Sequence, residues 1–104
     1  MFIAMNIFTI NNTRMAEFEE VWTNRERHLS EMQGFMNFKL LRGEASEDEK
    51  SRDYISHSTW KNSDDFWAWT KSENFKLAHK NKTPEGIIMG PPKFRSFETI
   101  LDES

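Results

Sequence analysis

The sequence contains no cysteine, and glycine and proline are scarce, with four and three residues among 104. Without thiols, the chain cannot form disulfides, thiolate metal sites, cysteine nucleophiles or a covalent c-type haem attachment. An excess of positive charge is also missing, because the formal net charge is −3. This balance argues against a general nucleic-acid-binding protein, which requires a basic face.

Long hydrophobic runs and familiar catalytic motifs are missing as well. The N-terminal run MFIAMNIFTI is too short to span a membrane and carries neither a basic leader nor a small-residue cleavage site. We therefore expect a cytoplasmic protein that does not bind a membrane. The sequence has no Ser-His-Asp order, phosphate-binding glycine loop or dinucleotide-binding fingerprint, and its carboxylate pairs occur only in polar clusters such as Asp64–Asp65.

Aromatic residues are abundant by contrast. They make up 13% of the chain and include nine phenylalanines and four tryptophans. A chain of this length is expected to form one domain, residues 1–104, with a single modest core. The aromatic side chains exceed what one thin core needs, so we expect a partner subunit or a flat ligand to cover part of them.

The N-terminal third of the chain predicts a strand followed by a helix. Residues 2–10 are apolar on both faces and interrupted only by Asn6, which is typical of a central strand. Residues 12–13 can cap a helix, whose apolar positions recur at helical spacing as far as Met32. Gly34 then occupies the position of a helix C-cap.

The rest of the chain predicts three more strands and one more helical region. In order, these are a strand over 35–43, an acidic loop over 44–53, a strand over 54–60, a helix from Asn62 or Ser63 to about Lys80 with a break allowed near 72–74, a loop over 81–93 and a strand over 94–101. The resulting β-α-β-β-α-β order indicates a ferredoxin-like α+β sandwich with both helices on one face of an antiparallel sheet. The apolar residues on both faces of the first strand favour a homodimer that covers the other face.

Three histidines are available for chemistry. His28 is expected on the surface, and His57, between two serines in a strand, is expected to be a hydrogen-bonded structural residue. Position alone favours a helix C-terminal role for His79 as well. However, a neutral imidazole beside large aromatic side chains is also what an axial haem ligand requires. No second His, Asp or Glu lies at chelating spacing from His79, so a zinc site is not expected.

An amide and two tryptophans are the other unusual features. Asn6 either bonds to a neighbouring loop or projects a polar group into an apolar pocket, since an unpaired buried amide costs about 1–3 kcal/mol. Trp67 and Trp69 diverge by about 200° on a helix, so one can face the sheet while the other faces a groove or solvent.

These residues together form a pattern with a known counterpart. Asn6 in the first strand is followed downstream by W-x5-F-x2-W-x-x-S-x-x-F-x-x-A-H, which is met by Trp60, Phe66, Trp69, Ser72, Phe75, Ala78 and His79. The pattern resembles the IsdG-type haem-degrading monooxygenases of the antibiotic biosynthesis monooxygenase superfamily, which are dimeric ferredoxin-like proteins. The resemblance extends over nearly the whole chain in element order, and its specific part is residues 60–79 together with Asn6.

The resemblance implies a role for each matching residue. His79 corresponds to the axial ligand of the haem iron, and Asn6 to the distal amide that hydrogen-bonds near dioxygen. Trp69 corresponds to the bulky residue that presses on the porphyrin and favours its ruffling. We expect the pocket to be lined or supported by three further residues, Phe66, Trp67 and Phe75.

The implied function is oxidative opening of the porphyrin ring with release of iron. Haem would be both substrate and cofactor, and dioxygen would be the oxidant. Because no flavin or nicotinamide motif is present, the electrons would come from an external reductase or a small reductant. Three alternatives remain: a cofactor-free oxygenase of the same superfamily acting on a quinol or polyketide-like aromatic, a haem-binding or haem-buffering protein without turnover, and a small dimeric domain whose cleft binds an unknown ligand.

Overall fold

A four-stranded antiparallel sheet forms the framework of the protein. The computed structural model describes residues 1–25, 28–79 and 83–104, and its strands lie within these ranges. The strands are β1 (Phe2–Asn11), β2 (Phe35–Ala45), β3 (Ser51–Trp60) and β4 (Lys93–Glu98). Their order in the sheet is β2-β3-β1-β4, so the strand with the interrupting Asn6 is central, as expected.

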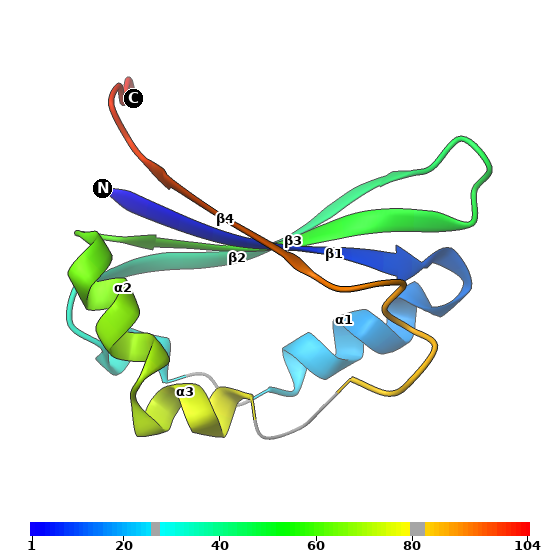
Figure 1. Ribbon diagram of the computed structural model, residues 1–104, viewed down its shortest axis with the longest axis horizontal. Helices are drawn as coiled ribbons and strands as arrows, with labels where there is room; N and C mark the ends of the chain where they lie inside the picture. Colours follow the sequence, from blue (N-terminus) through cyan, green and yellow to red (C-terminus); the bar gives the residue numbers. More distant parts are fainter. Residues whose placement is uncertain (26–27, 80–82) are drawn as a thin grey trace.

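The helices all lie on one face of this sheet (Figure 1). Helix α1 (Met15–Thr23) lies beneath one end, and helices α2 (Ser63–Thr70) and α3 (Glu73–Ala78) lie beneath the other. Two short 3-10 turns, η1 (Asn12–Arg14) and η2 (Leu29–Glu31), connect the helices to the strands. The predicted ferredoxin-like α+β fold is therefore confirmed.

The predicted length of the first helix was wrong. Helix α1 ends at Thr23 instead of continuing to Met32, and Leu29 packs into the core from η2. The Thr23 hydroxyl donates to the carbonyl oxygens of Glu19 and Glu20, which satisfies the last turn locally. Gly34 has the positive φ expected of it, +80°, but it follows the 3-10 turn and allows the Asp65 side chain to approach its backbone.

The other predicted boundaries differ by a few residues. Strands β2 and β3 extend to Ala45 and from Ser51, which shortens the acidic loop, and β4 covers 93–98 instead of 94–101. The break near residues 72–74 is confirmed, because the Ser72 hydroxyl accepts from the Phe75 N–H and starts a new helix. The predicted end of this helix at Lys80 and the first two residues of the 81–93 loop lie outside the described residues.

Two buried clusters fill the space between sheet and helices. The α2-side core consists of Phe2, Ala4, Leu29, Trp60 and Phe66. The α1-side core consists of Ile10, Phe18, Trp22, Tyr54 and Ile87. Strands β1 and β3 contribute to both clusters, and in the middle of the same strands the side chains on the covered face become polar, with Asn6 opposite Ser56.

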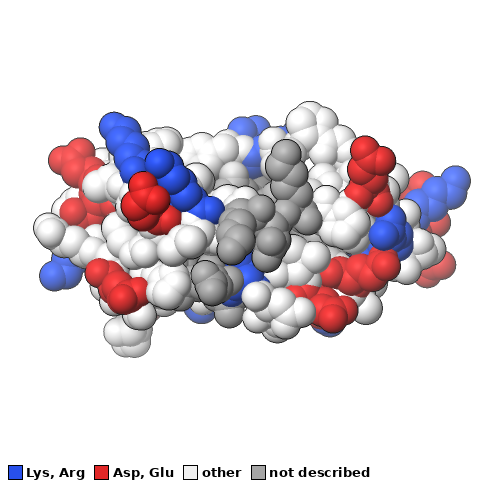
Figure 2. Space-filling view, turned by 90° about the horizontal axis from the view of Figure 1, so that it is seen from below, with Lys and Arg blue, Asp and Glu red and all other residues white. Residues whose placement is uncertain are grey.

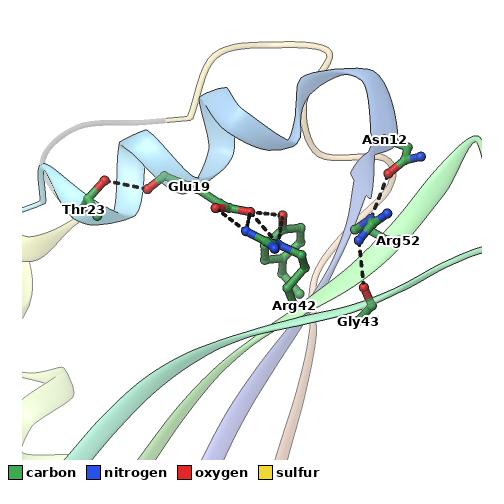
Figure 3. A network of polar contacts seen from close by, with 7 residues as sticks. Asn12, Glu19, Thr23, Arg42, Gly43 and Arg52 are labelled. Carbon is green, nitrogen blue, oxygen red and sulfur yellow. Dashed lines mark hydrogen bonds and ion pairs between the residues drawn. The ribbon is translucent and has the colours of Figure 1, made fainter.

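A polar network attaches α1 to the sheet (Figure 3). Arg42 of β2 donates two hydrogen bonds to the Glu19 carboxylate, at 2.7 and 2.8 Å, and the Tyr54 hydroxyl donates to the same carboxylate. Farther along the sheet, Arg52 donates to the Asn12 side chain and to the Gly43 carbonyl. Tyr54 is 1% exposed, so its hydroxyl requires such a partner.

The opposite face of the sheet is not covered by a helix (Figure 1). Its side chains come from the alternate positions of each strand and include Ile3, Met5, Ile7, Leu41, Ile55 and Phe97. Phe97 and Leu41 are 50% and 40% exposed. Among the described residues, no helix is long and apolar enough to cross a membrane.

Candidate functional site

A cavity of about 400 Å³ lies between the middle of the sheet and the helices. Its volume is in the range of small-molecule sites, roughly 300–1,000 Å³. The lining includes all six residues predicted for the site, Asn6, Phe66, Trp67, Trp69, Phe75 and His79. On the helical side of the molecule, the charged side chains of the described residues gather mainly toward the two ends (Figure 2).

The floor of the cavity is the middle of β1 and β3. In β1 the residues on the covered face are Ala4, Asn6 and Phe8, and in β3 they are Ser56 and Ser58. Because side chains alternate between the faces of a strand, these residues all project toward the helices. Apart from Phe8, the floor thus consists of small and polar side chains where a continuous core would have large apolar ones.

The wall on the α2–α3 side is aromatic. Trp69 packs edge-on against Phe75 with ring centroids 4.8 Å apart, and it is supported from behind by Trp60 at 5.6 Å. Phe66 is 5% exposed and belongs mainly to the core, whereas Trp67 is 45% exposed and contacts Phe94 of β4. Trp69 therefore has a firm position, while Trp67 lies at the outer edge of the cavity.

His79 follows the last residue of α3, and its imidazole is held by Phe75. The Nδ1 atom lies 2.8 Å from the Phe75 carbonyl oxygen, and the two rings stack with centroids 3.9 Å apart. Since a carbonyl can only accept, Nδ1 carries the proton in this contact. The lone pair of the neutral ring is then on Nε2, which is the arrangement that prepares a histidine to bind a metal.

Its surroundings also keep His79 neutral. Burial against the aromatic rings is the main cause that lowers the pKa of His79 below its usual 6.5, and the nearby positive charge of Arg25 lowers it further. The bond to the Phe75 carbonyl acts in the opposite direction. At neutral pH the imidazole is therefore unprotonated, although the residue as a whole keeps an exposed surface.

Asn6 lines the cavity and forms no side-chain hydrogen bond with another described residue. Of the two interpretations left open by the sequence, a bond to a loop and a polar group in an apolar pocket, the structure favours the second. A partly buried amide without a protein partner is free to bond to a ligand.

Positive charge reaches the cavity from the segment after α1. Arg25 lies over the Trp22 ring, with its guanidinium carbon 4.2 Å from the ring centroid, and both residues line the cavity. His28 also lines the cavity, and its Nδ1 lies 2.7 Å from a Glu31 carboxylate oxygen. The expected surface position of His28 is confirmed, because its side chain is 40% exposed, and the residue borders the cavity as well.

His57 departs from the expectation of a hydrogen-bonded structural residue. It lies on the uncovered face of the sheet, away from the cavity, and its Nδ1 is buried without a hydrogen-bond partner among the described residues. The expected structural hydrogen bond is thus missing at this nitrogen. Within the described residues, no three His, Asp or Glu side chains gather in a way that could hold a metal ion.

Several lining residues were not identified from the sequence. Ser56 and Ser58 could have been found, because they alternate with His57 in a strand that pairs with β1. Phe94 could not, since its place opposite Asn6 depends on the register between β1 and β4. No local sequence signal indicates that register.

Comparison with known proteins gives relatives for both sequence and fold. The family model for antibiotic biosynthesis monooxygenases matches residues 1–81. A haem-degrading monooxygenase from Shouchella clausii is 38% identical over 74 residues, which cover 67% of this chain and 66% of that protein. A staphylobilin-producing haem oxygenase from Staphylococcus haemolyticus is 28% identical over 82 residues, covering 79% of this chain and 76% of that protein.

Solved structures with the same fold include proteins with and without a cofactor. The haem degrader MhuD from Mycobacterium tuberculosis, solved with two haems in its active site, superposes over the full length of both chains with a TM-score of 0.77 and 20% identity. SnoaB from Streptomyces nogalater, a cofactor-independent oxygenase, covers 97% of this chain and 94% of its own, with a TM-score of 0.62 and 18% identity. At these identities the structural matches show the fold alone.

Proposed function

Since the chain belongs to the antibiotic biosynthesis monooxygenase family, we propose that it is a haem-degrading monooxygenase that opens the porphyrin ring and releases iron. The observation that carries the proposal is His79: a neutral imidazole, oriented through Nδ1, at a cavity with aromatic walls. The two sequence relatives support it, because both are named for haem degradation.

The residues of the cavity fit a haem. A large flat apolar ligand requires an aromatic cleft, and Trp69 and Phe75 supply one beside His79. A single imidazole as axial ligand leaves the other side of the iron open. The floor offers Asn6 as a hydrogen-bonding group in otherwise apolar surroundings.

Each of these residues has a distinct task in the proposed reaction. His79 would hold the iron through Nε2, and the Phe75 carbonyl keeps the orientation of its ring fixed. Asn6 would offer its amide hydrogens to dioxygen, and Trp69, supported by Trp60, would press on the porphyrin. The bound haem supplies both the redox-active iron and the carbon that is oxidised, with dioxygen as the oxidant and electrons from an external reductase or small reductant.

The carboxylates of the haem need a counter-charge at the rim of the cavity. Arg25 is suited to this, because its guanidinium lies on the Trp22 ring at the cavity lining. A guanidinium binds carboxylates with strong, directional hydrogen bonds. Arg25 would therefore fix the in-plane orientation of the haem.

The alternative functions share the fold but differ in which of the three residues His79, Asn6 and Trp69 they need. A cofactor-independent oxygenase acting on a quinol or polyketide-like aromatic would use the same apolar cavity without an axial ligand. A haem-binding protein without turnover would need His79 but neither Asn6 nor Trp69. These differences make the alternatives separable by variants at three positions.

Titration of the protein with hemin tests ligation. We expect a shifted Soret band that saturates at one haem per chain, and loss of the histidine-ligated spectrum in His79→Ala. His57→Ala is the matched control, because this histidine lies on the opposite face of the sheet and should leave the spectrum unchanged. Absence of specific hemin binding would refute both haem-dependent functions.

Turnover is tested by adding ascorbate or a reductase to the hemin complex under air. The enzyme reading predicts loss of the Soret band with release of iron, also in the presence of catalase. Asn6→Ala and Trp69→Ala should keep hemin binding while degrading it more slowly. A complex that never bleaches would support haem binding without turnover, and unchanged rates in both variants would contradict the tasks given to them.

We further propose that two chains pair through the uncovered face of the sheet. The apolar side chains there, with Phe97 half exposed, have no partner within the described part of the chain. Sedimentation velocity should show a dimer, and Phe97→Glu should shift it toward monomer because a charge would be placed in the interface. A monomeric native protein would rule the pairing out.

A further inference from the structure

Two serines on the cavity floor differ in how their hydroxyls are satisfied. Ser56 and Ser58 are both 7% exposed and belong to the same face of β3. The Ser58 oxygen accepts a hydrogen bond from the Trp60 indole N–H at 3.0 Å and lies 3.5 Å from the Ala4 carbonyl oxygen. Ser58 thus has a structural role, whereas the Ser56 hydroxyl has no hydrogen bond to another described residue.

The register of the sheet places Ser56 beside Asn6. The two residues are direct partners across β1 and β3, and both line the cavity. Directly opposite residues on one face of an antiparallel pair have their Cβ atoms about 4.5–5.5 Å apart. A hydroxyl and a carboxamide at this separation can both contact one small molecule placed above them.

Neither polar group forms a side-chain hydrogen bond with another described residue, and neither is among the fully buried unpaired atoms of that part of the chain, so both groups open into the cavity. A polar group that lines a cavity without a protein partner keeps its hydrogen-bonding capacity for a ligand. Two adjacent unsatisfied groups at the centre of one cavity therefore indicate a polar ligand that contacts both.

We propose that Ser56 is a second hydrogen-bonding residue of the site, and that its hydroxyl and the Asn6 carboxamide together hold one small polar molecule on the cavity floor. In the protein alone this molecule is water. In a haem complex, which rests on the proposed function, the two groups would hydrogen-bond to a small ligand such as dioxygen, carbon monoxide or water. Ser56 contacts it directly and does not act through Asn6.

The haem complex tests the contact with carbon monoxide as the probe. A hydrogen-bond donor near the oxygen atom of carbon monoxide lowers its stretching frequency, so Ser56→Ala should raise the infrared band of the ferrous complex. Ser56→Thr keeps the hydroxyl and should keep the band in its native position. The Asn6→Ala/Ser56→Ala double variant should have a higher frequency than either single variant, because the two contacts are separate.

Two results would overturn the proposal. One is a carbon monoxide band in Ser56→Ala at the native frequency. The other is a double variant indistinguishable from Asn6→Ala, which would mean that Ser56 acts only through the amide. In both cases hemin binding would be intact, so the proposed function would stand while the role of Ser56 would fall.

A crystal structure of the protein without haem decides the proposal even if hemin does not bind. We expect one ordered water within hydrogen-bond distance of both the Ser56 Oγ and the Asn6 side chain, and its loss in Ser56→Ala. Such a water, found in a protein that rejects hemin, would support the two-point site and refute the proposed function. A direct Ser56–Asn6 hydrogen bond without a shared molecule would refute the two-point site.

Discussion

The ends of strands β1 and β3 and the middle of the same strands follow different rules. At the ends, the covered face carries large apolar side chains such as Phe2, Trp60 and Tyr54, which pack into the two cores. In the middle it carries Asn6 and Ser56, which line a cavity. The residues at the ends stabilise the fold, whereas the polar residues in the middle stabilise it less than apolar ones would. This is typical of a binding site in a small domain.

The largest expected effect is a difference in the loss of stability between two tryptophan substitutions, one at an end of β3 and one at the cavity. Trp60 is fully buried, so Trp60→Ala should lower the free energy of unfolding by about 3–5 kcal/mol. Trp69 is only partly buried and borders the cavity, so Trp69→Ala should cost about 1–2 kcal/mol. Urea denaturation of the two variants measures the difference, and equal losses would mean that the middle is as tightly packed as the ends.

The fold was predictable because its local signals agree with its topology. The apolar strand with one polar interruption, the Ser72 cap and the turn residues together lead to the observed order of elements. The end of α1 at Thr23 was not predictable, since apolar residues at helical spacing continue beyond it and no glycine or proline intervenes before Gly34. Tertiary contacts of Leu29 with the α2-side core override that pattern.

The candidate site was predictable to a different degree. All six site residues predicted from the sequence line one cavity, but their roles toward a ligand stay predictions. Ser56 could also have been predicted as a site residue, because side chains alternate along β3 and this strand pairs with β1. This alternation could not have shown that Ser58 is satisfied by the Trp60 indole while Ser56 is not, because this depends on rotamers that only packing determines.

A second prediction concerns two polar residues of the cavity floor, whose substitutions should change the free energy of unfolding in opposite directions. Asn6→Leu replaces an unsatisfied amide by an apolar side chain of similar size and should raise the free energy of unfolding by about 1 kcal/mol. Ser58→Ala, a short distance away, should lower it by about 1–3 kcal/mol because the Trp60 indole loses its acceptor. Thermal and urea unfolding test both changes.

The opposite signs are the critical outcome of that pair. If Asn6→Leu destabilises the protein as much as Ser58→Ala does, the Asn6 amide is satisfied in the folded protein and the middle of the strands is not reserved for a ligand. A stabilised Asn6→Leu protein should also degrade hemin more slowly, since it lacks the amide.

The smallest expected effect is a difference in how the free energy of unfolding depends on pH, between His79 at the cavity and Glu19 at the α1 end of the sheet. The pKa of His79 is lowered, chiefly by burial, so the unfolded chain binds a proton more readily once the pH falls below 6.5. Stability should therefore begin to fall below pH 6.5, whereas hemin binding by the folded protein should persist until the pH approaches the lowered pKa of His79. The pKa of Glu19 at the α1 end is lowered from 4.5, chiefly by the hydrogen bond from the Tyr54 hydroxyl and then by Arg42. The contribution of Glu19 to stability is therefore complete above pH 4.5 and is lost only as the pH falls further. Unfolding measured from pH 7 to about pH 3 should show the loss of stability below pH 6.5 disappear in His79→Gln and the loss below pH 4.5 diminish in Glu19→Gln. If stability still falls below pH 6.5 in His79→Gln, another group titrates in that range. The cavity would then not differ from the α1 end through His79.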